Sequence, residues 1–167
     1  MINFASTGSL AGRFGYLWSD DEDLPVVIAS GWIDDPDYLT ALVHPSLRPM
    51  SIGRGDNPAI ESAVHAYSDG ELTAIDPVAV RQRSGPFIEA AWEALRKTPP
   101  GALTTYTGLA ADSGRSGAIR AAAAACARNA VALFVPCHRI IRTDGALGGF
   151  RYGLEIKRTL RAHEAAR

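Results

Sequence analysis

Short apolar runs separated by glycine and acidic residues dominate the first third of the chain. Aromatic and β-branched side chains cluster around Phe4, within 14–18, within 26–28 and at 32–33. Such runs, bounded by turn-forming residues, are typical of β-strands. We therefore expect the chain to begin with a small antiparallel sheet.

The apolar pattern changes from strand-like to helical after residue 34. Asp35-Pro36 and Asn57-Pro58 each place a capping side chain directly before a proline, which is favoured in the first turn of a helix. After the second cap, the apolar residues of one helical face are Ile60, Ala63, Val64 and Tyr67. Gly70 predicts the end of this helix.

Residues 76–86 contain few apolar side chains and two prolines, so we place a domain boundary there. The fold class predicted is α+β, with an amino-terminal α+β domain over 1–80 and a second, mostly helical domain over 84–167. Ser84 is the expected cap of the first helix of the second domain. The face predicted to be buried on that helix consists of Phe87, Ala91, Trp92 and Leu95.

Two short helical stretches follow over 105–111 and 116–128, interrupted at 112–114. A short helix, a glycine-containing turn and a second helix form the helix-turn-helix pattern. The second stretch is rich in alanine, and small side chains allow another surface to approach closely; tight packing against another helix explains them equally well. Three further elements are expected: a buried strand over 131–135, a tight turn at Asp144-Gly145 and a closing helix over 154–164.

Charge is distributed unevenly along a chain whose net charge is only −1. Residues 1–80 contain three basic and twelve acidic side chains, and the remainder contains fourteen basic and six acidic ones. This split favours contact between the second half and a polyanion, although an acidic first half could simply increase solubility. Arg120 and Arg128 lie on the alanine-rich helix and favour DNA as that polyanion.

The composition disfavours several classes of protein. No run of 18 apolar residues is present, so we expect no membrane span. The first residues lack the basic and apolar regions of a signal peptide. The four histidines and two cysteines show no zinc-binding spacing, so we expect neither a metal nor a cofactor. We interpret Cys126 and Cys137 as reduced thiols, Cys126 as a structural one, and expect a cytoplasmic location.

The segment VPCHRII at 135–141 carries the candidate chemistry. Pro136 breaks strand pairing, which would place Cys137 at a strand end, where a nucleophile can face a pocket. The neighbouring His138 can accept the thiol proton and generate a thiolate near neutral pH. A Cys-His pair alone is weak evidence, and a buried structural thiol is the commoner explanation of such a residue.

The segment PCHRI at 136–140 resembles the active-site signature of the O6-alkylguanine-DNA alkyltransferases. It is most similar to the alkyltransferase half of the bacterial adaptive-response regulator. Further positions that match the family pattern are Tyr106, Arg120, Asn129 and Glu164, together with the loop 144–153. The resemblance extends from about residue 84 to the end of the chain. Because these positions match one pattern together, the resemblance outweighs the structural explanation that each residue has by itself.

The resemblance implies a role for each of these residues. Cys137 would be the alkyl acceptor, activated by His138, which Glu164 would polarise through a water molecule. Asn129 would hold the backbone between the recognition helix and the active-site segment, and Tyr106 would protonate the leaving guanine at N3. The residues implied to form the base pocket are Ala132, Ile140, Phe150, Arg151 and Tyr152. Those implied to contact DNA are Arg120, which would fill the space left by the extruded base, Ala121 and Arg128.

Taken together, these matches imply direct-reversal DNA repair. The O6-alkyl group of guanine in double-stranded DNA would move irreversibly to Cys137, once per molecule. The resemblance also implies a ribonuclease H-like amino-terminal domain, a helix-turn-helix that docks in the minor groove, and a monomer that associates with the nucleoid during repair. The target base must leave the stack, at a cost on the order of a few kcal/mol.

The chain departs from the family pattern at Ile88, where glutamine is common, and at Ala130 and Ala132, where proline occurs. Tyr152 stands where several members have glycine, and Ala132 stands where those members have a proline that can pack on a flat ring, so both residues predict that large O6 substituents are disfavoured. Three alternatives remain. A non-catalytic damage sensor would lack the cysteine, a cysteine hydrolase explains neither the helix-turn-helix nor the arginines, and a transcription regulator would carry a further DNA-binding or sensor domain.

Overall fold

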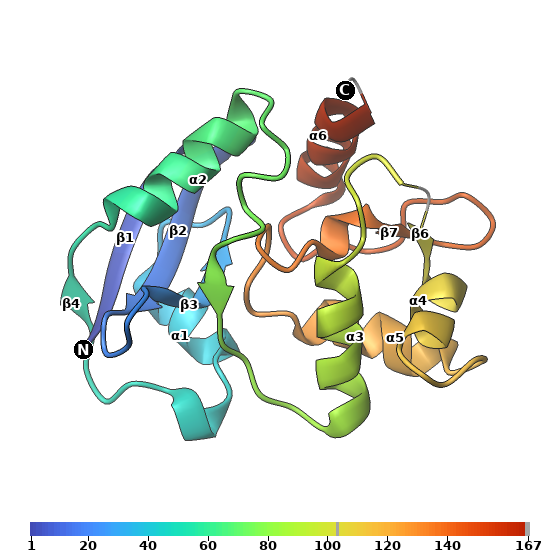
Figure 1. Ribbon diagram of the computed structural model, residues 1–167, viewed down its shortest axis with the longest axis horizontal. Coiled ribbons are helices and arrows are strands. Elements are labelled where there is room, and N and C mark those ends of the chain that lie inside the picture. Colours follow the sequence, from blue (N-terminus) through green and yellow to red (C-terminus); the bar gives the residue numbers. More distant parts are fainter. Residues whose placement is uncertain (103, 166–167) are drawn as a thin grey trace. The chain divides into compact units, whose positions relative to one another are not determined.

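The computed structural model describes residues 1–102 and 104–165 (Figure 1). The chain forms two compact units, the first made of Met1–Arg83 with Ala130–Phe134 and the second of Ser84–Asn129 with Val135–Arg167. The sequence predicted residues 130–134 within the second domain, whereas the structure assigns them to the first unit. The chain therefore passes between the units three times rather than once.

The first unit contains a five-stranded sheet with the strand order β4-β1-β2-β3-β5. Its centre is the predicted antiparallel part, formed by β1 (Ile2–Ser9), β2 (Gly12–Ser19) and β3 (Val26–Gly31). Two short edge strands that the sequence did not predict, β4 (Gly53–Arg54) and β5 (Ala79–Val80), pair in parallel with β1 and β3. The sheet is therefore mixed rather than purely antiparallel.

Both predicted helix caps of the first unit are confirmed. The Asp35 carboxylate accepts a hydrogen bond from the Asp37 amide at 2.9 Å and begins α1 (Pro36–Leu42). The Asn57 side chain accepts one from the Ala59 amide at 3.0 Å and begins α2 (Pro58–Ser68). The buried residues of α2 are the predicted Ile60, Ala63, Val64 and Tyr67. Figure 1 shows α2 running along β1, with which it is in contact.

Residues 131–135 are buried as predicted, but they do not form a strand. Only one isolated bridge, from Val131 to Ser30, joins this segment to β3. The Ala132 amide donates to the Ser30 carbonyl at 3.1 Å, and the Ser30 hydroxyl donates to the Ala132 carbonyl at 2.8 Å. The next residue, Leu133, has a φ of 74°, which turns the backbone away from extended geometry. An apolar run therefore predicted burial correctly and conformation wrongly.

The second unit is mostly helical, as predicted. Its helices are α3 (Pro86–Arg96), α4 (Tyr106–Asp112), α5 (Ile119–Arg128), the 3-10 helix η2 (Cys137–Arg139) and α6 (Leu154–Ala165). The strands β6 (Thr104–Thr105) and β7 (Ile140–Ile141) pair in parallel. The helices α3, α4 and α5 pack against one another, and α4 and α5 form the predicted helix-turn-helix. A further 3-10 helix, η1 (Pro45–Leu47), belongs to the first unit.

The start of α3 differs from the prediction. Gly85 occupies the cap position and makes no side-chain capping bond, so Ser84 is not the cap. Ile88 is buried on this helix in place of Phe87, whose ring lies 5.5 Å from the Arg115 guanidinium. The other predicted residues of this face, Ala91, Trp92 and Leu95, are buried, so the prediction is wrong at one position only.

No helix among the described residues is long and apolar enough to cross a membrane. Within the same residues, no group of three His, Cys, Asp or Glu side chains is arranged to hold a metal ion.

Candidate active site

Cys137 is the first residue of the 3-10 helix η2 and is buried. Its amide donates to the Val135 carbonyl at 2.8 Å, which tightens the backbone around Pro136. The Asn129 side-chain amide donates to the same carbonyl at 2.8 Å and also forms a hydrogen bond with the Cys137 side chain. Asn129 is the residue that caps the carboxyl end of α5. It therefore connects the end of α5 to the segment that carries Cys137.

The surroundings of Cys137 act on its thiol in opposite directions. Burial raises the pKa of Cys137, while the Asn129 hydrogen bond and the positive charges of Lys157 and Arg151 oppose that rise. The sequence predicted a thiolate near neutral pH. The direction of this pKa shift instead favours the neutral thiol at rest, because desolvation penalises the charged form most. The hydrogen bond and the two cations are the groups that stabilise the thiolate as it forms.

His138 forms a direct hydrogen bond with Glu164, which corrects the expected water-mediated link. The His138 Nε2 atom lies 2.8 Å from Glu164 Oε2, and both side chains are buried. Burial alone would raise the pKa of Glu164, but the hydrogen bonds and charges of His138 and Arg139 lower it to about 2. An ionised carboxylate only accepts hydrogen bonds, so the proton of the imidazole resides on Nε2.

The other ring nitrogen of His138 is consequently the basic one. Among the described residues, Nδ1 of His138 is buried and has no hydrogen-bond partner. Burial lowers the pKa of His138, and the contact with Glu164 opposes this. A neutral imidazole with a free lone pair on Nδ1 can accept a proton from the adjacent residue, Cys137.

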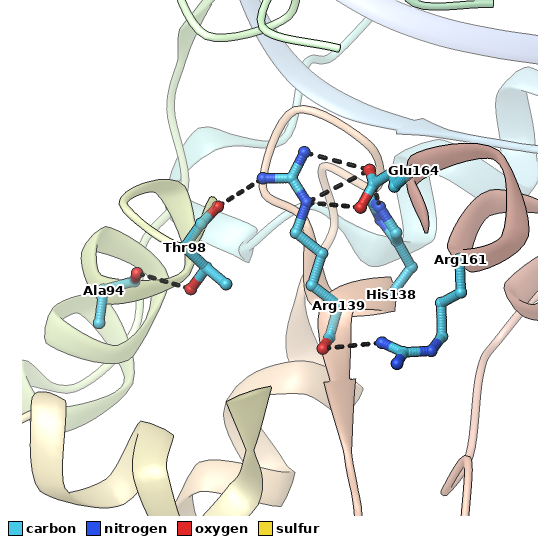
Figure 2. A network of polar contacts seen from close by, with 6 residues as sticks. All are labelled: Ala94, Thr98, His138, Arg139, Arg161 and Glu164. Carbon is cyan, nitrogen blue, oxygen red and sulfur yellow. Dashed lines mark hydrogen bonds and ion pairs between the residues drawn. The ribbon is translucent and has the colours of Figure 1, made fainter. Parts of the chain in front are cut away.

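Arg139 completes this buried network, although the sequence analysis assigned it no role. Figure 2 shows its side chain between Thr98 and Glu164. Arg139 Nε lies 3.0 Å from Glu164 Oε1, and Nη1 donates to the Thr98 carbonyl at 2.5 Å. Its carbonyl accepts a hydrogen bond from Arg161 of α6 at 3.1 Å. The available signal was its position inside the PCHRI motif, next to two apolar residues, where an unpaired arginine would be costly.

Lys157 is a second residue that the sequence analysis missed. It is fully buried on α6, on the same helical face as Leu160 and Glu164. Its Nζ atom donates to the Leu147 carbonyl at 2.5 Å and to the Gly149 carbonyl at 3.2 Å. Lys157 therefore holds the loop 144–153 while placing a positive charge near the thiol. Its spacing from Leu160 and Glu164 was the signal that could have found it.

A pocket of about 540 Å³ opens beside Tyr106. The residues that line it are Tyr106, Ile119, Arg120, Ala123, Arg142, Thr143, Asp144, Gly148 and Gly149. Gly148 has a φ of 73°, and a Cβ atom there would lie 2.8 Å from the Tyr106 hydroxyl. Burial raises the pKa of Tyr106 to about 12, and the nearby Cys126 and Cys137 contribute smaller effects in the same direction. The Tyr106 hydroxyl therefore keeps its proton at neutral pH.

All three residues that were expected to contact DNA lie on α5, and one of them lines this pocket. Arg120 lines it and is exposed, and Ala123 of the same helix also lines it. Arg128 is exposed at the last position of α5. The predicted Ala121 is half-buried on α5.

The expected base-pocket residues lie in three different settings. Ile140 is buried in β7, whereas Arg151 is exposed and donates to the Ala127 carbonyl at the end of α5. Phe150 and Tyr152 pack edge to face, with ring centroids 5.9 Å apart. Ala132 belongs to the first unit and is not among the residues that line the pocket. Of the two residues expected to restrict large substituents, Tyr152 alone belongs to the unit that contains the pocket.

The second unit is similar to a domain of known proteins. Residues 86–166 match the family model described as "6-O-methylguanine DNA methyltransferase, DNA binding domain". This match defines the class of the second unit, whose helix-turn-helix adjoins the buried Cys-His-Glu arrangement.

Relatives that are similar over most of the chain extend this result. A methylated-DNA–protein-cysteine methyltransferase of Salmonella typhimurium is 33% identical over 93% of this chain and 92% of that protein. The regulatory protein ada of the same organism is 34% identical over 98% of this chain, which spans 46% of that longer protein. The chain belongs to the methylated-DNA–protein-cysteine methyltransferase family.

Solved structures show the same similarity in three dimensions. The O6-methylguanine methyltransferase of Mycobacterium tuberculosis superposes with a TM-score of 0.78 at 26% identity, over 100% of this chain and 94% of that chain. A second structure from this organism, solved in complex with DNA, has a TM-score of 0.79 at 25% identity and covers 98% and 93% of the two chains.

Proposed function

We propose that this protein repairs DNA by direct reversal, moving the O6-alkyl group of guanine, a methyl group in the first instance, to Cys137. The observation that carries the proposal is the pairing of His138 Nε2 with Glu164, which leaves Nδ1 as the basic nitrogen of the residue that follows the buried Cys137 in the chain. Membership of the methyltransferase family supports the same reaction.

The transfer begins at the Cys137 thiol and ends with the alkyl group on its sulfur. His138 Nδ1 takes the Cys137 proton, and the thiolate attacks the alkyl carbon as the bond from that carbon to guanine O6 breaks. The electron pair of the broken bond stays with guanine, which takes a proton from the Tyr106 hydroxyl at N3. The proton held by His138, exchanged through solvent, restores the Tyr106 hydroxyl, so the products are guanine and a thioether on Cys137. The S–C bond of a thioether is stable under these conditions, so the alkyl group stays on Cys137 and each molecule acts once.

The substrate is double-stranded DNA with the damaged base turned out of the helix. The second unit, residues 84–129 and 135–167, carries both the chemistry and the DNA contact. The alanine-lined face of α5 approaches the minor groove, and Arg120 fills the space that the extruded base leaves. The protein acts as a monomer, without metal or cofactor, in the compartment that contains the DNA.

Intact mass spectrometry tests this proposal. Incubation with duplex DNA containing O6-methylguanine should add one methyl group per molecule, located on Cys137, and the reaction should then stop. Cys137→Ala should abolish transfer and retain DNA binding, whereas Cys126→Ala, the matched thiol control, should leave transfer intact. Repeated turnover on excess substrate, or methylation at another residue, would refute the proposal.

A further inference from the structure

Arg142 lies on the wall of the pocket that contains Tyr106 and Arg120, and the alkyl transfer described above does not use it. Its side chain is 63% exposed, and its ion-pair partner Asp144, 3.9 Å away, is 65% exposed. An ion pair this long between solvated groups contributes little. The Arg142 guanidinium is therefore available to an incoming anion.

The backbone that carries Arg142 is held firmly even though its side chain is exposed. The Arg142 amide donates to the Ala146 carbonyl at 2.8 Å, and the Gly145 amide donates to the Arg142 carbonyl at 2.9 Å. The neighbouring Thr143 hydroxyl lies 2.8 Å from the Thr107 hydroxyl on α4, the helix that begins with Tyr106. Arg142 is consequently held in place relative to the pocket and to Tyr106.

The electrostatics of the pocket agree with this placement. The charge of Arg142 acts on Tyr106, opposing the larger effect of burial on the pKa of that hydroxyl. Of the described residues that line the pocket, Asp144 alone is acidic, and Arg120 and Arg142 are the basic ones. Asp144 would repel an anion unless Arg142 offset its charge, so the net charge of the wall favours an anion.

The chemistry of a nucleotide identifies this anion. A base that enters the pocket is joined through its sugar to two flanking phosphates, which must then lie near the rim. A guanidinium binds a phosphate with two parallel hydrogen bonds, which makes arginine well suited to this position. We propose that Arg142 binds a phosphate that flanks the extruded nucleotide and so stabilises the extruded state; this role rests on the proposed repair function.

Single-turnover methyl transfer from two substrates tests the proposal: duplex DNA containing O6-methylguanine, and the free base O6-methylguanine. Arg142→Gln should weaken duplex binding and slow duplex repair by about tenfold at low salt, the loss expected for a charge-assisted contact. It should slow the reaction with the free base much less, because there only the small effect of the Arg142 charge on Tyr106 is lost. The plot of log affinity against log salt should become shallower by about 0.9 for the one phosphate lost.

Two further variants separate a phosphate contact from a folding effect. Arg158→Gln is the matched control, because Arg158 is an exposed arginine paired with Glu155 on α6, and it should change neither substrate's rate. Arg142→Lys keeps the charge and should restore the salt dependence but only part of the affinity, since lysine cannot form the paired hydrogen bonds.

Replacing each flanking phosphate in turn with an uncharged methylphosphonate locates the contact. At one of the two positions, the methylphosphonate should weaken duplex binding by the native protein as much as Arg142→Gln does. The same methylphosphonate should not weaken binding by the Arg142→Gln variant any further. Three results would overturn the proposal. Arg142→Gln could slow the reactions with duplex and free base equally, or it could behave as Arg158→Gln does. The third is that Arg142→Gln and the methylphosphonate weaken duplex binding additively at both phosphate positions. If the native protein methylates itself with neither substrate, the repair function itself fails instead.

Discussion

The Glu164 carboxylate lies 2.8 Å from the His138 imidazole, within direct hydrogen-bonding distance, and both side chains are buried. The same carboxylate accepts hydrogen bonds from Arg139. A single buried carboxylate thus holds the His138 imidazole and neutralises the charge of the buried Arg139. Removal of its charge would affect catalysis and stability together, because a buried ion without its partner is strongly unfavourable.

The first prediction concerns acid stability. Glu164 has a pKa of about 2 in the folded protein and an ordinary value of 4.5. Its contribution to stability is therefore present above about pH 4.5 and is lost as the pH falls towards 2; a shift of this size corresponds to a contribution on the order of 3 kcal/mol. Urea unfolding at several pH values should show a weaker acid dependence for Glu164→Gln than for the native protein. Glu155→Gln, at an exposed position of the same helix, should retain the native profile.

The second prediction concerns the pH dependence of alkyl transfer. Burial places the pKa of His138 below its ordinary value of 6.5, so the imidazole stays neutral and basic at pH 7. The single-turnover rate should therefore be flat near neutrality and fall only below about pH 6.5, as His138 becomes protonated. A rate that instead climbs about tenfold per pH unit into the alkaline range would mean that solvent, not His138, deprotonates Cys137.

The third prediction concerns the close approach of Gly148 to Tyr106. Gly148→Ala would place a Cβ atom 2.8 Å from the Tyr106 hydroxyl, at a φ of 73° that disfavours side chains. It should lower the free energy of unfolding by about 1–3 kcal/mol and slow repair. Gly149→Ala, where nothing lies within 4 Å, should change little. In a Tyr106→Phe background the cost of Gly148→Ala should shrink, because the clashing oxygen is gone; equal costs in both backgrounds would exclude this contact as the cause.

The fourth prediction concerns Lys157. Lys157→Met keeps most of the side-chain volume but leaves the Leu147 and Gly149 carbonyls without their donor. The variant should be less stable by about 1–3 kcal/mol, and its thiol should be harder to ionise because a nearby positive charge is lost. Lys97→Met, at an exposed position after α3, is the control and should match the native protein in both respects. Thiol reactivity towards a small alkylating reagent across pH measures the second effect.

Local signals in the sequence were sufficient for much of the fold. The caps Asp35 and Asn57, the buried face of α2 and the turn at Asp144-Gly145 all matched the structure, because each depends on residues within one or two turns of the chain. The family was also predictable, since the PCHRI motif and the positions of Tyr106, Asn129 and Glu164 form one pattern.

The tertiary structure alone decided which partners the buried charged side chains have. It paired Arg139 with Glu164 and Thr98, placed Glu164 directly on His138, and buried Lys157 under the loop 144–153. These contacts join residues far apart in sequence, and a buried ion chooses its partner by proximity and desolvation rather than by local propensity.

The segment 130–134 shows most clearly which properties the sequence determined and which the tertiary structure determined. Its apolar side chains determined that it would be buried, which the sequence by itself established. Its conformation, the positive φ of Leu133 and its place in the first unit depend on the hydrogen bonds that Ser30 makes with Ala130 and Ala132. Burial follows from the composition of a segment, whereas its backbone path depends on which distant polar groups are there to satisfy its amides and carbonyls.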